Sequence, residues 1–191
     1  MKIIVGITGA SGAVLGVELL KAFRNQPQCE THLVISDGAK KTLSLESGLE
    51  VKDVVSLADH YYDINNMGAV IASGSFRTDG MIIIPCSMKT LAAVVHGYAD
   101  NLLTRAADVC IKENRRIILV PREMPLSRIH LKNMLEASDI GCAIIPPVLT
   151  FYNQPGTIQD QINHLIGKIL MQFGLDHSLF SPWKGEVEKK G

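Results

Sequence analysis

The chain has 191 residues, and its 19 lysine and arginine residues balance its 19 aspartate and glutamate residues, so its formal charge is zero. This length fits a single domain over residues 1–191 with a sizeable core. The sequence has no concentrated basic segment for nucleic acid or an anionic membrane and no run near the roughly 18 apolar residues of a spanning helix, so we expect neither partner.

Short runs rich in isoleucine and valine alternate with segments of helical periodicity along the chain. The runs do not alternate with polar residues, so they predict an α/β fold whose mostly parallel sheet is covered on both faces. The predicted strands span residues 2–8, 31–36, 80–85, 116–121 and 142–146, with a short further strand at 69–73. The predicted helices span residues 12–24, 38–46, 87–96, 101–112, 127–137 and 157–173.

The last predicted helix carries clear signals at both ends. Thr157 and Asp160 resemble a capping box, and Gly174 supplies the C-terminal stop. Three polar residues fall on the face opposite its apolar stripe, namely Gln161, His164 and Lys168. The tail from about residue 181 to 191 is charged, and we expect it to be extended.

The four cysteines are widely spaced, without a C-x-x-C pair or a cluster with histidine. This spacing favours neither a zinc site nor a disulfide framework, and it fits a reducing compartment, so we expect a cytoplasmic protein without a bound metal. The apolar start at Ile3 could imitate a secretory signal, but glycines interrupt it, which favours a first strand and a glycine turn. The hydrophobic content of 47% indicates either a well-filled core or an apolar surface covered by partner subunits.

A glycine-rich turn, residues 6–13, follows the first predicted strand. Glycine lets the backbone approach a ligand closely, and the N-terminus of the next helix favours negative charge. The spacing is not G-x-G-x-x-G, so the dinucleotide fingerprint is not met. Asp37, after the second strand, could imitate the ribose-binding acid of an NAD site, but the glycine pattern gives that interpretation little weight.

A second turn, Pro85-Cys86-Ser87-Met88-Lys89-Thr90, delivers a buried strand to a helix N-terminus. Ser87 and Thr90 can donate hydroxyl hydrogen bonds and Lys89 adds a positive charge, which predicts a phosphate site. The alternative is that Ser87 only caps the helix, and this run alone gives the two equal weight. No Walker A motif is present, so by elimination the two turns suit a mononucleotide or a flavin better than NAD or ATP.

Four polar residues share one face of the predicted helix after Asp100, namely Asn101, Arg105, Asp108 and Lys112. They form either a solvated stripe stabilised by pairs three and four residues apart, or a bracket in which two cations about 10 Å apart hold an anion. The pattern does not choose between them.

Two further segments present polar groups. Arg122 and Glu123 stand between prolines at the end of a predicted strand, where open α/β sheets place ligands, although a surface ion pair is the alternative. Tyr152 is either a packing aromatic or a phenol offered to a ligand. There is no G-x-S-x-G nucleophile motif and no D-D-x-x-D magnesium motif, so any isoprenoid chemistry here is expected to be metal-free.

Taken in order, these motifs resemble the UbiX-like flavin prenyltransferases, in particular the small subunit associated with hydroxyarylic (phenolic) acid decarboxylase systems. The resemblance runs from about residue 2 to residue 183. Its motifs are residues 8–13 (TGASGA), 72–76 (ASGSF), 85–90 (PCSMKT), 100–109 (DNLLTRAADV), 121–123 (PRE), 130–134 (HLKNM) and 151–155 (FYNQP).

The resemblance implies a Rossmann-like (flavodoxin-like) three-layer sandwich that assembles as a homododecamer, with active sites between subunits. It implies that FMN is held by Gly9, Ala10, Ser11, Ser36, Ser87, Met88, Lys89, Thr90 and Arg122. Dimethylallyl monophosphate would be held through Tyr152 and Lys168, with Arg105, Lys112 and Glu123 near its phosphate, and Glu46 matches a further acidic position.

The implied reaction is metal-independent and joins a dimethylallyl group to N5 and C6 of reduced FMN. Arg105, Lys112, Lys168 and Tyr152 would stabilise charge on the departing phosphate, and Glu123 or Glu46 would move a proton. The prenylated FMN would pass to a separate UbiD-like decarboxylase.

The sequence departs from the family pattern in two places. Residues 65–71 contain no aromatic, where some members have tryptophan, and Lys168 stands where arginine is frequent. Two other functions stay open: an FMN-dependent decarboxylase of the related cysteine-decarboxylating group, and a non-catalytic flavin carrier.

Overall fold

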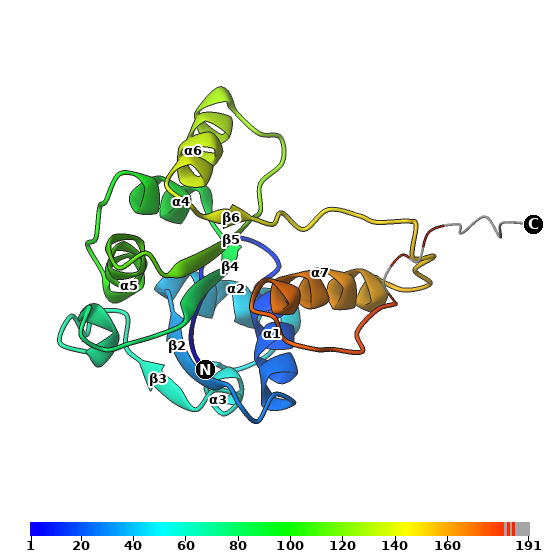
Figure 1. Cartoon of the computed structure of the whole chain (residues 1–191), viewed down its shortest axis with the longest axis horizontal. Helices are drawn as coiled ribbons and strands as arrows, with labels where there is room; N and C mark the ends of the chain where they lie inside the picture. The colour runs from blue at the N-terminus through cyan, green and yellow to red at the C-terminus, as the bar shows by residue number, and fades with distance from the viewer. Residues whose placement is uncertain (182, 184, 186–191) are drawn as a thin grey trace, which may run out of the picture. The chain divides into compact units, whose positions relative to one another are not determined.

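The computed structural model describes residues 1–181, 183 and 185. In this part of the chain, six strands form one parallel sheet in the order β3-β2-β1-β4-β5-β6 (Figure 1). The strands are β1 (Lys2–Ile7), β2 (Glu30–Ile35), β3 (His60–Tyr62), β4 (Gly80–Cys86), β5 (Arg116–Pro121) and β6 (Ala143–Ile144). The predicted parallel α/β sheet is confirmed.

All six predicted helices are present. They are α1 (Val14–Arg24), α2 (Asp37–Ser47), α4 (Met88–Val95), α5 (Leu102–Lys112), α6 (Arg128–Asp139) and α7 (Ile158–Gln172). An unpredicted helix, α3 (Val51–Val55), is one short turn closed by a capping box between Glu50 and Asp53. Within the described residues no helix is long and apolar enough to cross a membrane.

The strands differ from the prediction in three places. The segment predicted as a strand at residues 69–73 is a 3-10 helix, η1 (Val70–Ala72), because its backbone closes a local turn in which the amide of Ala72 donates to the carbonyl of Ala69 at 2.9 Å. The edge strand β3 was missed because its sequence, His-Tyr-Tyr, is polar and partly exposed. The last strand, β6, has two residues rather than the five predicted.

The central strands are buried along almost their whole length, as the sequence predicted. One face of the sheet, with Ile4, Met81 and Ile83, packs in a common core with Leu91 of α4 and Leu103 of α5. Helix α1 packs against β1 and β4 on the other side of the strands, where Gly16 is required because a Cβ there would lie 2.7 Å from Ile7. The core therefore fixes the strand ends, and with them the turns that follow β1, β2 and β4.

The chain forms two compact units, Met1–Pro147 and Val148–Gly191. In the second unit the predicted capping box is confirmed: Thr157 accepts from the amide of Asp160, whose carboxylate accepts from the amide of Thr157. The predicted stop is confirmed as well, since Gly174 follows α7 with a φ of +67°. The single domain over 1–191 stays a prediction. The expected extended tail falls largely on residues 182, 184 and 186–191, which lie outside the described residues.

Candidate functional site

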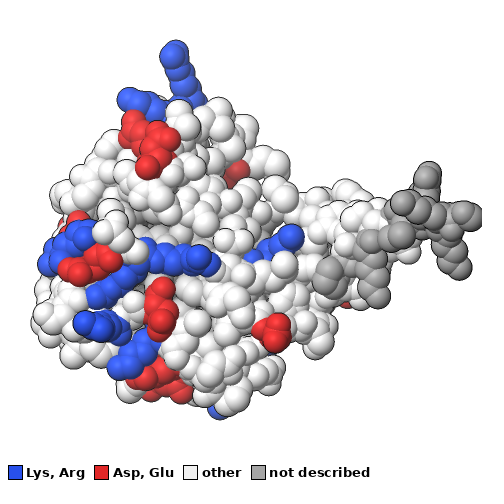
Figure 2. All heavy atoms as spheres, viewed as in Figure 1, with Lys and Arg blue, Asp and Glu red and all other residues white. Residues whose placement is uncertain are grey.

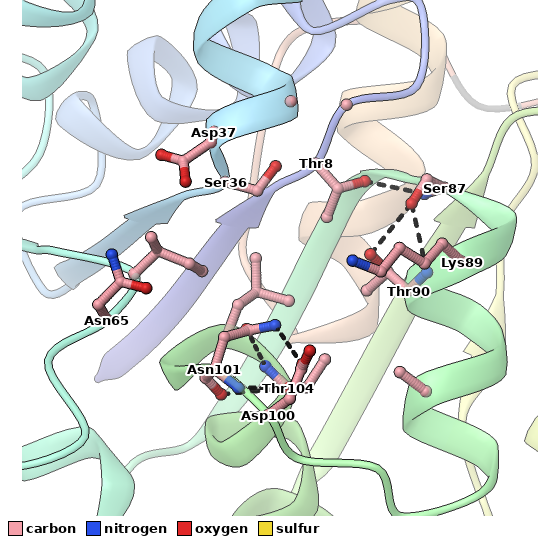
Figure 3. A pocket seen from close by; sticks show the side chains of 15 residues that line it. Thr8, Ser36, Asp37, Asn65, Ser87, Lys89, Thr90, Asp100, Asn101 and Thr104 are labelled. Atoms are coloured by element: carbon pink, nitrogen blue, oxygen red, sulfur yellow. Dashed lines mark hydrogen bonds between the residues drawn. The ribbon is translucent and has the colours of Figure 1, made fainter.

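A polar cleft of about 420 Å³ lies at the carboxyl ends of β1, β2 and β4 (Figure 3). Strands β1 and β4 are neighbours, but the chain leaves β1 toward β2 and leaves β4 toward β5. Open α/β sheets bind ligands at such a reversal of strand order. The lining residues are Thr8, Gly9, Ser36, Asp37, Gly38, Ile64, Asn65, Ser87, Lys89, Thr90, Ala93, Asp100, Asn101, Leu103 and Thr104.

Three helices begin at this cleft, and the N-cap residue of each one lines it. Ser36 caps α2 by accepting from the amide of Ala39 at 3.2 Å. Ser87 caps α4 by accepting from the amide of Thr90 at 3.3 Å, and Asn101 caps α5. The amides of a helix's first turn have no acceptor inside the helix, and the helix dipole adds partial positive charge. The cleft is therefore suited to an anion.

The capping alternative for Ser87 is thus confirmed, and it is compatible with an anion site. The cap uses one amide of the first turn, while the amides of Met88 and Lys89 precede any intrahelical acceptor. The side chain of Lys89 lines the cleft and brings a full positive charge. Met88 packs its side chain against the core and is not among the residues that line the cleft.

Thr8 joins the two turns that the sequence singled out. Its hydroxyl donates to the carbonyl of Pro85 at 2.7 Å. It also accepts from the amide of Ser87 at 2.8 Å (Figure 3). The Thr8 side chain is almost fully buried, so these bonds are shielded from water. The glycine turn and the start of α4 consequently hold a fixed relative position.

The turn after β1 passes very close to the start of α2. A Cβ on Gly9 would lie 3.0 Å from the backbone of Gly38, which is tighter than almost all real contacts. Only glycine at position 9 allows the two backbones to approach this closely. Because of this close approach, the turn after β1 and the start of α2 both line the cleft, through Gly9 and Gly38.

Ser11 on the loop after Gly9 forms a cluster with Glu46 of α2 and with Arg122, which follows β5. The carboxylate of Glu46 accepts from the amide of Gly12 at 2.8 Å, and Nε of Arg122 donates to the carbonyl of Ser11 at 3.1 Å. Partial burial would raise the pKa of Glu46, but hydrogen bonds from Ser11 and from the loop backbone, with the charge of Arg122, lower the pKa overall. Glu46 is therefore a carboxylate at neutral pH.

The structure brings five of the nine predicted flavin residues together in the cleft: Gly9, Ser36, Ser87, Lys89 and Thr90. Ser11 and Arg122 contact each other in the adjoining cluster with Glu46, while Ala10 is buried and Met88 packs against the core. Glu123 follows Arg122 on the exposed surface, where its carboxylate accepts from the amide of Met124 at 3.1 Å.

Arg105 and Lys112 do not line the cleft. Arg105 pairs with Asp108 at 2.6 Å and donates to the carbonyl of Ala72 at 3.2 Å, while Lys112 pairs with Glu113. Both cations border the loop of residues 72–76, since a Cβ on Gly74 would lie 2.8 Å from Lys112 Nζ. Figure 2 shows lysine and arginine intermixed with acidic side chains on the face in view. Pairing within the stripe is therefore confirmed for Arg105.

In the second unit, Tyr152 contacts His164, and the charge of Lys168 lies nearby. The Tyr152 hydroxyl lies 3.1 Å from Nε2 of His164. Burial, and then the nearby charge of Lys168, lower the pKa of His164, so its ring is neutral at pH 7. His164, predicted on the face of α7 opposite the apolar stripe, is buried there against aromatic rings, including Phe180. Tyr152 also borders a pocket of about 430 Å³ formed by residues of this unit.

The family model described as Flavoprotein matches residues 1–172. A protein of Sedimentibacter hydroxybenzoicus named probable UbiX-like flavin prenyltransferase is 63% identical over 185 residues, which are 97% of this chain and 98% of that protein. The chain belongs to the UbiX-like flavin prenyltransferase family.

Two solved structures of the family have the same fold as this chain. The dodecameric FMN-dependent UbiX-like decarboxylase from Escherichia coli O157:H7 has a TM-score of 0.95 and 56% identity, covering 97% of this chain and 100% of that one. AnUbiX in complex with FMN and dimethylallyl pyrophosphate has a TM-score of 0.94 and 49% identity, covering 97% and 98%. The predicted Rossmann-like, flavodoxin-like fold is confirmed.

Several lining residues of this family member were not singled out from the sequence as site residues. Thr8, Asn65, Asp100, Asn101 and Thr104 all line the cleft. Thr8 belongs to the motif of residues 8–13, and Asp100, Asn101 and Thr104 belong to that of residues 100–109. The cap pattern from Asn101 to Thr104 is a usable signal for a third helix start. Asn65 lies in an irregular loop and offered no sequence pattern.

Proposed function

We propose that this chain is a metal-independent transferase that joins a dimethylallyl group from a dimethylallyl phosphate to N5 and C6 of reduced FMN. The observation that carries the proposal is the cleft into which three helix N-termini and Lys89 converge, in a chain 63% identical to a named UbiX-like flavin prenyltransferase. The donor loses inorganic phosphate, and the five-carbon unit becomes bonded to both flavin atoms.

FMN is proposed to bind through the predicted residues of the first unit, with its phosphate at the helix N-termini. The free first-turn amides of α4, the hydroxyls of Ser87 and Thr90, and Lys89 supply donors and charge for a dianion. The loop cluster of Ser11, Glu46 and Arg122 offers further polar groups at the edge of the same turn. Gly9 and Gly38 have no side chains, which would let the isoalloxazine ring lie directly against the backbone.

The second phosphate needs cations that the cleft of one chain does not supply. Helix α5 begins at the cleft with its cap Asn101, and Lys112 lies eleven residues later, about 16 Å along the axis at 1.5 Å per residue. The position of Lys112 supports sites shared between copies of the chain, in which Arg105 and Lys112 of one copy serve the cleft of another. We propose a homododecamer, the assembly named for the Escherichia coli O157:H7 relative.

Breaking the allylic C–O bond leaves charge on the departing phosphate. Tyr152 and Lys168, together with Arg105 and Lys112, are proposed to stabilise that charge, and excluding water strengthens their effect. Glu46, held as a carboxylate, is suited to accept a proton from the flavin. Exposed Glu123 is proposed to exchange a proton with phosphate. The product is then proposed to pass to a UbiD-like decarboxylase.

The proposal is tested by mass spectrometry of the flavin recovered after anaerobic incubation with reduced FMN and dimethylallyl monophosphate. The expected result is a mass gain of one five-carbon unit, lost in Lys112→Ala and kept in Lys132→Ala, a matched lysine on α6 paired with Glu136. A parallel reaction with the diphosphate measures donor preference. Unmodified FMN that stays tightly bound would favour the carrier, and carbon dioxide released from a peptidyl cysteine would favour the decarboxylase.

A further inference from the structure

A cluster of two histidines and a glutamate lies on the edge strands of the sheet, away from the flavin cleft. Glu30 and His32 stand two residues apart on β2 and therefore share one face. His60 of β3 is the direct register partner of His32. The group sits at the start of both strands, whereas the cleft lies where the strands end.

The three side chains bring their ligand atoms close together. Nε2 of His60 lies 2.9 Å from Oε1 of Glu30, and Nε2 of His32 lies 3.4 Å from the same oxygen. With one ligand atom taken from each residue, the three atoms lie within 4.8 Å of one another. A tetrahedral site with bonds of about 2.0–2.1 Å spaces its ligands by roughly 3.3–3.4 Å, so these separations bracket the required value.

His32 carries the second, independent observation. Its side chain is almost completely buried, and its Nε2 has no hydrogen-bond partner in the described part of the chain. Its other nitrogen, Nδ1, lies 2.9 Å from the Tyr62 hydroxyl. A histidine that donates Nδ1–H to a neighbour presents Nε2 as a lone pair, which is how metal-binding imidazoles are oriented. A buried ring nitrogen without a hydrogen-bond partner calls for a ligand.

We propose that Glu30, His32 and His60 bind one divalent transition-metal ion of the zinc class. Two imidazole nitrogens with one carboxylate form a donor set that suits Zn²⁺, and Mg²⁺ or Ca²⁺ would require more oxygen ligands. The His60 side chain is 49% exposed, so its ring can turn toward the ion and leave the fourth position to water.

One neighbouring positive charge, that of Lys2, opposes binding of a cation, so removing this charge tests where the ion binds. The ammonium of Lys2 lies 4.0 Å from the other oxygen of Glu30 and 4.6 Å above the Phe76 ring. It competes for the carboxylate and repels a cation. Lys2→Gln is therefore expected to tighten metal binding, whereas a site formed elsewhere in the chain would not respond.

The test titrates Zn²⁺ into the full-length, tag-free protein by calorimetry, and Co²⁺ in a parallel optical titration. The expected result is one ion per chain, a higher melting temperature, and the visible Co²⁺ bands of a tetrahedral nitrogen and oxygen site. His60→Ala and Glu30→Gln abolish these signals, while Tyr62→Phe weakens affinity by about 10- to 100-fold. His96→Ala, an exposed histidine of the α4 C-terminus, leaves them unchanged.

Three results would overturn the proposal. They are the absence of stoichiometric binding, binding that His60→Ala and Glu30→Gln leave intact, and a Co²⁺–thiolate charge-transfer band that assigns the ion to cysteine. Because His60 is exposed and lies outside the cleft, its alanine variant is expected to fold and to keep flavin binding, and near-native circular dichroism checks that it does.

Discussion

The side-chain oxygen of Thr8 lies 2.8 Å from the backbone nitrogen of Ser87, a residue 79 positions later in the chain. This bond, with the one from Thr8 to Pro85, fixes the distance between the two turns that are proposed to bind flavin. Thr8→Val keeps the shape but leaves the partly buried amide of Ser87 without its acceptor, and the Pro85 carbonyl keeps only the bond from the Thr8 amide at 3.3 Å. We expect it to lower the free energy of unfolding by about 1–3 kcal/mol and to weaken FMN binding. Urea denaturation and FMN titration measure both, and Thr8→Ser, which keeps the hydroxyl, should recover most of each.

The contact between Gly9 and Gly38 predicts that any side chain at position 9 displaces the turn after β1. In Gly9→Ala the new Cβ would meet backbone at 3.0 Å, and backbone cannot swing aside as a flexible side chain does. We expect a large loss of FMN affinity in fluorescence titration. Gly68→Ala is the matched control, because its Cβ would meet only Asn66, at 3.5 Å, and its affinity should equal that of the wild type.

Glu46 predicts a pH dependence of stability. Its folded-state pKa lies below the ordinary value of 4.5, so the unfolded chain binds the proton more readily. The contribution of the Glu46 carboxylate to the free energy of unfolding is therefore complete above the ordinary pKa of 4.5. It is lost as the pH falls through the lower pKa of the folded state. Urea midpoints measured from neutral to acidic pH should fall less steeply in Glu46→Gln, whose amide oxygen can still accept from Gly12. Identical slopes would contradict this assignment.

His164 is expected to position the Tyr152 hydroxyl. Nε2 of His164 is hydrogen-bonded to this hydroxyl at 3.1 Å, so His164→Leu removes the bond that orients the phenol. If Tyr152 holds the prenyl donor, the KM for dimethylallyl phosphate should rise roughly two- to tenfold, with FMN affinity unchanged. A double-mutant cycle decides the point: in a Tyr152→Phe background, His164→Leu should add little. A full additional effect there would show that His164 acts through packing.

Sharing of active sites predicts complementation between inactive variants. Lys89→Ala damages the cleft but keeps Lys112, and Lys112→Ala does the reverse. Co-refolded mixtures should form prenylated FMN at a rate that neither variant reaches alone. Mixtures no more active than their components would mean that each chain works with its own Lys112.

The strands and helices could be predicted wherever burial is uniform. β1, β4 and β5 are covered on both faces, so hydrophobic runs marked them with near-correct ends. β3 could not be found in this way because its three residues are held by pairing with β2, and pairing leaves no hydrophobic signature. The segment 69–73 is apolar because it packs against α5, so its composition suggested a strand that its backbone does not form.

The site could be predicted in part for a related reason. Turns that follow strands can be recognised in a sequence by their glycine, serine and proline residues. The turns after β1, β2 and β4 do line one cleft. Helical spacing correctly placed Arg105 and Lys112 on one face, but it cannot say which end of a helix is near the cleft. That depends on the direction in which α5 crosses the sheet. The burial of His164 likewise depends on residues such as Phe180, which are distant in sequence.

The sheet ends on one side with the three residues of β3 and on the other with the two residues of β6. Edge strands this short offer an incoming strand very few backbone groups to pair with, which protects against edge-to-edge aggregation. Copies of this chain are consequently expected to join through helices and loops. The resulting contacts can then close into a finite particle instead of propagating as an open fibre.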